Sequence, residues 1–311
     1  MGTPEFSVPC LEALISRSGC EVAGVFTQPD RPKGRGNKMS ASPVKEAAVK
    51  AGIPVFQPER IRKTGIEDLR ALKPDLCVTA AFGQILSREI LEIPPMGNIN
   101  VHASLLPKHR GSAPIAYAIM DGDETAGVTT MMMDEGIDTG DMLLKAETKI
   151  LPAETCGELT QRLSRIGAEL LTMTLDALEA GSLVRTPQND SEMTYDPMLN
   201  KTMGCVDFNL DAQRVKGLVN GLNPWPCVSV PLEGNRLKLL RAETAEGNGI
   251  AGTVLKADPK SGLIIACGKG AIRILELQAP GGKRMRSEDF LRGHGIEEGT
   301  CFSECQIRKT I

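Results

Sequence analysis

The stretch Gly97-Asn-Ile-Asn-Val-His-Ala-Ser-Leu-Leu-Pro107 joins a short apolar strand to a rigid proline turn, and it decides the fold of the N-terminal part. Side chains alternate between the two faces of a strand, so Asn100 and His102 share one face of Ile99–His102. Ile99 and Val101 then pack on the other face. A strand that ends in a polar pair and a turn is typical of an α/β sheet, in which ligands bind at the carboxyl ends of the strands.

Apolar runs alternate with segments of helical period on both sides of this stretch, along residues 1–180. The predicted strands are Val22–Thr27, Leu76–Ala81, Ile99–His102 and Val128–Met133. The predicted helices are Val8–Ser16, Val44–Lys50, Ile66–Leu72, Ala113–Met120 and a long helix that opens with a Thr155–Glu158 capping box and stops at Gly181. The alternation predicts an α/β domain with a doubly wound, mostly parallel sheet over residues 1–185.

The C-terminal third has a different pattern. Residues 186–204 lose periodicity and predict a linker. Asp211 then caps a predicted short helix, and the predicted strands that follow are Val228–Leu232, Leu237–Arg241, Gly252–Lys256, Leu263–Cys267 and Ile272–Leu277. Short strands separated by Gly, Pro and Asn predict a small, OB-like β-barrel domain over residues 205–311.

Composition excludes several classes of function. The chain has 311 residues, 41% of them hydrophobic and 24% charged, which is globular composition and enough for two domains. No apolar run reaches the roughly 18 residues of a membrane span, so we expect a soluble, cytoplasmic protein without membrane contact. No Cys-x-x-Cys occurs, and the three histidines do not lie at ligand spacing from cysteines, so no metal site is predicted.

Charge is unevenly distributed. The net charge is −3, but residues 203–311 hold 15 Lys and Arg against 12 Asp and Glu, whereas residues 1–202 hold 21 against 27. The basic surplus of the C-terminal part favours an anionic partner there, although by itself it does not distinguish RNA from chance.

Two segments carry the candidate chemistry. Asn100 and His102 place an amide and an imidazole in one pocket, and the loop Asp134-Glu-Gly-Ile-Asp-Thr-Gly-Asp141 adds carboxylates beside glycines that allow a close backbone approach. Without further context, His102 is equally well interpreted as a half-buried structural histidine. The acidic loop by itself fits a solvated turn, or a cation-binding loop without the full calcium pattern, better than a catalytic element.

Together, Asn100-x-His102, Ser104-Leu-Leu-Pro107, Arg110-Gly111 and Ile137-Asp-Thr-Gly-Asp141 resemble the folate-dependent formyltransferases. The resemblance covers nearly the whole chain. Gly2-Thr-Pro-Glu-Phe6, Thr27-Gln-Pro-Asp-Arg-Pro32, Ala81-Phe-Gly-Gln-Ile-Leu86 and Asn223-Pro-Trp-Pro226 narrow it to members that formylate methionyl initiator tRNA. The implied co-substrate is 10-formyltetrahydrofolate, with no metal, and we expect a monomer.

The resemblance implies a role for each site residue. Asn100 and protonated His102 would donate hydrogen bonds to the oxyanion of the transition state, while Asp138 would hold His102 and help to remove the amine proton. The implied folate-binding residues are Ser104, Leu105, Leu106, Pro107, Gln84 and Leu86. The resemblance implies tRNA binding by the basic loop that holds Arg35 and Lys38. The clustering of cations in the C-terminal part adds Lys283, Arg284 and Arg286 as candidates for contact with RNA.

Other interpretations remain open at this stage. The basic loop also fits an ordinary solvated loop. A formyltransferase for another amine, or a formyltetrahydrofolate hydrolase, would share the catalytic residues, and a non-catalytic RNA-binding module would not need them to converge. Because family members carry a β-strand before Gly-Thr-Pro, the resemblance also implies several apolar residues upstream of Met1 in the native product.

Overall fold

The computed structural model describes residues 1–33 and 38–302, and the chain divides into two compact units. The first unit comprises Met1–Gly111, Gly127–Thr148 and Thr160–Tyr195. The second comprises Ser112–Ala126, Lys149–Leu159 and the chain from Asp196 onward. The predicted boundaries of 1–185, 186–204 and 205–311 stay a prediction. No helix in the described part of the chain is long and apolar enough to cross a membrane.

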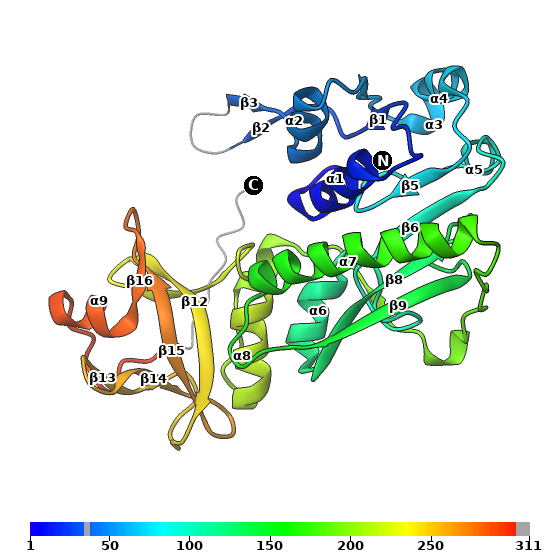
Figure 1. Cartoon of the computed structure of the whole chain (residues 1–311). Coiled ribbons are helices and arrows are strands. Elements are labelled where there is room, and N and C mark those ends of the chain that lie inside the picture. The colour runs from blue at the N-terminus through cyan, green and yellow to red at the C-terminus, as the bar shows by residue number, and fades with distance from the viewer. Residues whose placement is uncertain (34–37, 303–311) are drawn as a thin grey trace. The chain divides into compact units, whose positions relative to one another are not determined.

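The first unit is built on a four-stranded sheet with the order β5-β6-β8-β9 (Figure 1). Its strands are β5 (Cys77–Thr79), β6 (Asn98–His102), β8 (Thr125–Met132) and β9 (Met142–Lys149). β5 and β6 are parallel, β6 and β8 antiparallel, and a separate parallel pair joins β1 (Val25–Phe26) to β4 (Val55–Phe56).

Helices pack around these strands. They are α1 (Val8–Ser16), α2 (Pro43–Lys50), α3 (Ile61–Thr64), α4 (Ile66–Leu72), α5 (Arg88–Leu91) and the long α7 (Cys156–Glu179). Figure 1 shows α7 lying along the sheet. Gly167 of α7 has no side chain, which allows close approach to Val101 and Val128, and Thr174 hydrogen-bonds Thr130 at 2.8 Å. α7 therefore covers the sheet face that carries Val101.

The chain start lies between the two sets of strands. The Gly2 amide donates to the Phe26 carbonyl (3.0 Å), and the Ala80 amide donates to the Met1 carbonyl (2.9 Å). The Met1 amine donates to the Val78 carbonyl at 2.6 Å. Met1 and Gly2 also line a cavity of about 510 Å³. The backbone of Met1–Gly2 thus connects the strand that contains Phe26 to the segment that contains Ala80.

The smaller elements of the first unit lie mainly in its connections. β2 (Arg31–Lys33) and β3 (Lys38–Ser40) pair in antiparallel orientation. The others are η1 (Glu5–Ser7), β7 (Arg110–Gly111), η2 (Asp190–Glu192) and β10 (Tyr195–Asp196), which runs into the second unit.

The second unit contains an antiparallel sheet with the order β11-β12-β15-β14-β13, and β16 pairs with β15. Its strands are β11 (Val228–Leu232), β12 (Asn235–Ala245), β13 (Val254–Asp258), β14 (Gly262–Ala266), β15 (Ala271–Gln278) and β16 (Arg284–Arg286). Its helices are α6 (Pro114–Asp121), η3 (Lys201–Gly204), α8 (Ala212–Gly221) and α9 (Ser287–Gly293). The sheet is a half-barrel, and its inward side chains, among them Leu239, Ile265 and Ile274, are fully buried.

The fold class predicted from the sequence is confirmed: an α/β unit with parallel strand pairs is followed by a small antiparallel half-barrel. The predicted helix caps are also present. Asp211 accepts a hydrogen bond from the Arg214 amide (2.8 Å), and the Thr155 amide donates to Glu158 (3.0 Å). Among the described residues, seven strands were not predicted: β2, β3, β4, β7, β9, β10 and β16.

Candidate active site

Strand β6 carries the predicted amide and imidazole on one buried face. Asn100 pairs with Met131 and His102 with Thr129 across the β6–β8 ladder, so these four side chains share the face opposite α7. Asn100 is 8% exposed and His102 is 6% exposed. The predicted alternation along this strand is therefore correct.

The His102 ring lies between two oxygen acceptors. Its Nε2 is 2.9 Å from the His109 carbonyl oxygen, and its Nδ1 is 3.5 Å from Asp138 Oδ1. An imidazolium ring can donate from both nitrogens at once, whereas neutral imidazole can donate from only one. The arrangement fits a histidine that is held in orientation by a backbone carbonyl on one side and a carboxylate on the other.

Asp138 reaches His102 from the loop between β8 and β9. Its backbone adopts the left-handed conformation, with φ of 54°, which is uncommon for a residue with a side chain. Its Oδ2 accepts a hydrogen bond from the Gly111 amide at 2.8 Å, which leaves Oδ1 toward His102. The neighbouring Asp134 instead closes the loop by accepting from Gly136 and Thr139 (3.0 and 2.6 Å).

Asn100 differs from His102 in having no partner for its side-chain amide within residues 1–33 and 38–302. A buried amide is normally hydrogen-bonded, so a free one on the face of a candidate site is available to a ligand. The structure brings the three predicted catalytic side chains to one sheet face and the loop beside it. Their catalytic roles stay a prediction.

The turn Ser104–Pro107 folds over the same face of the sheet. Thr129 Oγ1 donates to the Ser104 carbonyl (2.7 Å) and accepts from the Leu106 amide (3.2 Å). The Lys145 ammonium donates to the Leu106 carbonyl. Leu106 packs in the interior with Met131 and Met142, while Leu105 is partly exposed. The Ser104 hydroxyl donates to the Lys108 carbonyl (2.7 Å), and the Leu106–Pro107 peptide is cis.

Thr129 and Lys145 are residues that the sequence interpretation missed. Thr129 had a detectable signal, because a hydroxyl inside the apolar run Val128–Met133 requires a hydrogen-bond partner. Lys145 had none, because its strand was not predicted.

The side chains of the other two candidate folate-binding residues contact other parts of the first unit. Gln84 accepts from the Ile61 amide (2.6 Å) and donates to the Pro58 carbonyl (2.9 Å). Leu86 is 4% exposed and packs in a core cluster with Phe26 and Phe82. These side chains hold the loop in place, and what they leave for a ligand is the backbone of residues 83–86.

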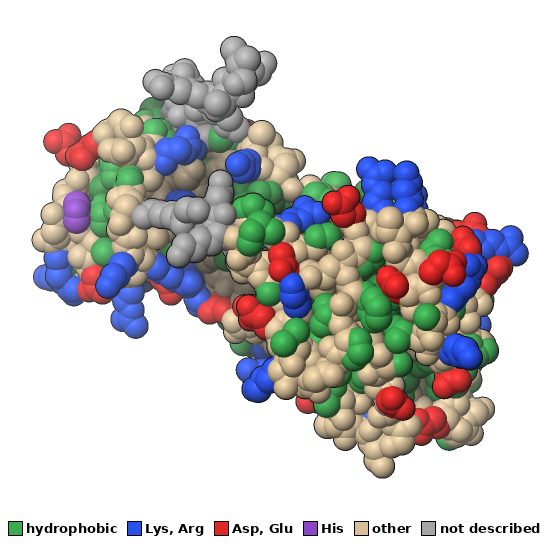
Figure 2. All heavy atoms as spheres, turned by 90° about the horizontal axis from the view of Figure 1, so that it is seen from above, with side chains coloured by type: hydrophobic (Ala, Val, Ile, Leu, Met, Phe, Trp, Pro, Cys, Tyr) green, Lys and Arg blue, Asp and Glu red, His purple; other side chains and the backbone are tan. Residues whose placement is uncertain are grey.

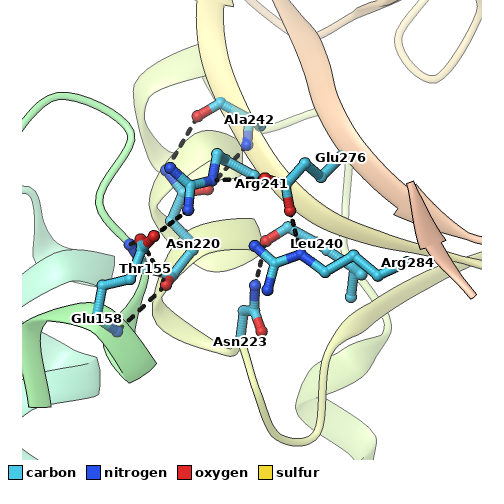
Figure 3. Close-up of polar contacts among 9 residues, drawn as sticks. All are labelled: Thr155, Glu158, Asn220, Asn223, Leu240, Arg241, Ala242, Glu276 and Arg284. Atoms are coloured by element: carbon cyan, nitrogen blue, oxygen red, sulfur yellow. Dashed lines mark hydrogen bonds and ion pairs between the residues drawn. The ribbon is translucent and has the colours of Figure 1, made fainter. Parts of the chain in front are cut away.

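The candidate tRNA-binding residues fall into two sets. Arg35 lies outside the described residues, and Lys38 contributes backbone to β3. Lys283, Arg284 and Arg286 are exposed on or beside β16. Arg284 pairs with Glu276, which also lies 3.5 Å from Arg241 (Figure 3).

Arg241 also contacts Glu158 of the capping box, so charges of alternating sign run from α7 to β16 (Figure 3). Burial opposes ionisation of Glu158, but hydrogen bonds from Thr155 and Arg241 lower the pKa of its carboxyl group. In the described part of the chain, Lys283 and Arg286 have no acidic partner, in contrast to Arg284.

Comparison with known proteins defines the class. The family model described as "Formyl transferase" matches residues 1–175, and the one described as "Formyl transferase, C-terminal domain" matches residues 198–295. The chain belongs to the formyl transferase family. It is 50% identical over 308 residues to the methionyl-tRNA formyltransferase of Trichlorobacter lovleyi, covering 99% of this chain and 97% of that protein. It is 52% identical over 300 residues to the protein of the same name from Geotalea daltonii, covering 96% of each.

Solved structures share the fold at lower identity. The N-formyltransferase from Helicobacter canadensis, in complex with folinic acid and dTDP-3-aminofucose, has a TM-score of 0.64 at 17% identity, covering 87% of this chain and 95% of its own. HypX from Aquifex aeolicus, in complex with tetrahydrofolic acid, has a TM-score of 0.58 at 20% identity, covering 81% of this chain and 47% of its own. At these identities the likeness is evidence for the fold alone.

Proposed function

We propose that this chain transfers the formyl group of 10-formyltetrahydrofolate to the α-amino group of methionyl initiator tRNA. The relatives that carry the name methionyl-tRNA formyltransferase match it over nearly their full length at about half identity, which supports the acceptor. The observation that carries the chemistry is the His102–Asp138 pair at 3.5 Å on the sheet face that also holds the unpartnered Asn100 amide.

The reaction requires a neutral amine to attack the formyl carbon. A carbon–nitrogen bond forms, the bond to N10 of the folate breaks, and the proton lost by the amine balances the one gained by N10. The tetrahedral intermediate carries a negative oxygen, and donors fixed in advance stabilise it more than they stabilise the substrates. The Asn100 amide and the Nδ1–H of His102 are the donors that we assign to this oxygen, because Nε2 is held by the His109 carbonyl at 2.9 Å whereas Nδ1 lies 3.5 Å from Asp138.

Asp138 serves as the orienting and proton-accepting group. Its Oδ1 faces the His102 ring, and its Oδ2 is held by the Gly111 amide, so the carboxylate has little freedom to rotate. A base in this position can accept the amine proton directly or through one water molecule.

We assign folate binding to the Ser104–Pro107 turn and to the backbone near Gln84 and Leu86. The turn is fixed by Thr129 and Lys145, and Leu105 remains partly exposed at its apex. A flat, fused ring fits a slot with apolar walls and main-chain hydrogen-bonding groups.

We assign tRNA contacts to Arg35, Lys38, Lys283, Arg284 and Arg286. Cations bind phosphates without reading bases, so these residues position the tRNA and leave its identity to other contacts. Charged tRNA and reduced folate are cytoplasmic reactants, and a cytoplasmic, monomeric enzyme stays our expectation.

One assay tests the proposal. The purified protein is incubated with 10-formyltetrahydrofolate and methionyl initiator tRNA, and the esterified amino acid is analysed for N-formylmethionine. The matched control uses Asp138→Asn protein, and parallel reactions replace the tRNA with an amino sugar nucleotide or with buffer alone. Formylation of the sugar, hydrolysis of the donor in buffer, or tRNA binding without any turnover would each replace the proposed function by one of its rivals.

A further inference from the structure

Gln188 makes a three-way contact on the loop that carries Asp138. Its Nε2 donates to the carbonyl oxygens of Asp138 (2.7 Å) and Gly140 (2.8 Å), which uses both of its hydrogens. Its Oε1 accepts from Arg110 Nε at 3.0 Å. The amide therefore bridges two carbonyls of one loop and a buried guanidinium.

These contacts link Gln188, Arg110, Gly111 and Asp138 into a closed ring. Arg110 holds Gln188, and Gly111, the next residue along the chain, donates its amide to the Asp138 carboxylate at 2.8 Å. Gln188 thus fixes the backbone of Asp138, and the Gly111 amide fixes its side chain. The Arg110 side chain is 4% exposed and pairs with Asp190 at 2.7 Å, so the guanidinium is itself held in place.

The ring of contacts holds Asp138 in a left-handed backbone conformation. This backbone conformation is less favourable than the common conformations for a residue with a Cβ, and the surrounding contacts help to hold it. If the two hydrogen bonds from Gln188 are removed, the loop can relax toward a commoner conformation. That relaxation turns the carboxylate away from His102 Nδ1, which now lies 3.5 Å from it.

We propose that Gln188 is a positioning residue, which holds Asp138 against His102 through the Arg110–Gly111 ring and without touching a substrate. The inference rests on the proposed function, because it assigns Gln188 an effect only through Asp138. The sequence interpretation placed Gln188 in a linker, where nothing marked it as part of a site.

The test compares kcat and KM in Gln188→Met and Gln188→Glu. Methionine keeps the size of the side chain and removes all three hydrogen bonds, while glutamate keeps the acceptor toward Arg110 and directs an oxygen at the two carbonyls. We expect kcat for formylation to fall by about tenfold to a hundredfold in both, the range for a reacting group displaced by up to an ångström. KM for folate and for tRNA stays within about twofold, since neither contact is lost.

A double-mutant cycle separates positioning from general destabilisation. If Gln188 acts through Asp138, adding Gln188→Met to Asp138→Asn lowers kcat by less than about threefold further. The matched control is Asn220→Leu, which removes another buried amide that hydrogen-bonds Ala242 (3.0 and 2.9 Å; Figure 3). Its effect, if any, multiplies with that of Asp138→Asn. Each variant is assayed below its own melting temperature.

The outcomes distinguish the inference from the proposed function. An Asp138→Asn enzyme with unchanged kcat would remove Asp138 from the mechanism. An impaired Asp138→Asn enzyme, combined with full activity of Gln188→Met or with losses that multiply in the double variant, would overturn the positioning role. Should both Gln188 variants fail to fold, Asp190→Asn provides the same test, because Asp190 is exposed and pairs with Arg110. We expect a smaller loss of kcat, and this loss does not multiply with that of Asp138→Asn.

Discussion

Substitution of Asn100 can separate an effect on the chemical step from an effect on folate binding. It lies on the buried face of β6 and has no partner in the described residues, so its removal leaves no group of the protein unpaired. We expect Asn100→Ala to lower kcat by roughly a hundredfold or more, the loss of about 3 kcal/mol typical of one oxyanion donor. KM for the folate donor stays nearly unchanged, and steady-state kinetics measure both constants.

Asn98 is the matched control on the same strand. Its Nδ2 donates to the Leu91 carbonyl at 2.9 Å, so Asn98→Ala removes a structural hydrogen bond. We expect a lower melting temperature with kcat within a few-fold of the parent. Equal losses of kcat in the two variants would mean that Asn100 has no special role.

The residues of the site differ in how far the sequence could predict them. The period of two sufficed for Asn100 and His102, since they lie two positions apart on one strand. Their distance from Asp138 depends on how the β8–β9 loop folds back, which only the structure gives. Gln188 lies fifty positions after Asp138 in a segment without periodicity, so no local pattern could connect the two residues.

At the scale of elements, β8 presents adjacent threonines to opposite faces of the sheet. Thr129 holds the Ser104–Pro107 turn, and Thr129→Val removes both hydrogen bonds without changing side-chain size. We expect the free energy of unfolding to fall by about 1–3 kcal/mol, because buried backbone groups of the turn lose their partner. KM for the folate donor rises more than kcat falls, since the turn is assigned to binding.

Thr130→Val is the control one residue away. Thr130 is also fully buried, but its hydroxyl contacts Thr174 of α7 on the other face. It is expected to destabilise the protein, measured by thermal melting, and to leave KM for folate unchanged. A rise in this KM for Thr130→Val as large as for Thr129→Val would contradict the assignment of the turn.

Elements with a strong apolar pattern were predictable, and elements without one were not. α1 and β11 have the predicted bounds, and the capping box starts α7 where Thr155 indicated. The expected strand Val22–Thr27 is reduced to Val25–Phe26, because only two residues pair with β4. β9 was missed because only its first residues are buried, while the rest alternates between half-buried and exposed.

At the scale of the whole molecule, part of the positive charge of the C-terminal part is used in ion pairs. Figure 2 shows Lys and Arg side chains interspersed with Asp and Glu side chains on the face in view. Arg241, Arg273, Arg284 and Arg292 each pair with at least one carboxylate. Among the proposed tRNA contacts of the described second unit, Lys283 and Arg286 therefore keep their charges available.

Lys283→Ala tests this availability. If Lys283 contacts a phosphate, the slope of log KM for tRNA against log salt concentration decreases by up to about one, because one fewer counterion is released. KM for folate does not change. Lys260→Ala, which removes another exposed lysine of the same unit, is the control and is expected to keep the parental slope. A parental slope for Lys283→Ala would remove this residue from the tRNA interface.

In a chain that begins at Met1, the buried amine makes stability depend on pH in a direction that can be worked out. Burial lowers the pKa of the Met1 amine below its ordinary value of 8.0, so below pH 8.0 the unfolded chain binds a proton that the folded chain binds less readily. The free energy of unfolding therefore rises with pH up to this value. Above pH 9.0 the trend reverses, because burial raises the pKa of the Cys10 thiol to about 12 and only the unfolded thiol ionises.

We expect the melting temperature of a chain prepared to begin at Met1 to increase between about pH 6.5 and 8.5, relative to the same chain acetylated at its amine. Acetylation removes the titrating group and keeps an N–H that can donate to the Val78 carbonyl, and Met1 lines a cavity of about 510 Å³ that can take the two added carbon atoms. Differential scanning calorimetry of both chains across this range measures the effect. Parallel curves would show that the Met1 amine keeps its proton on folding.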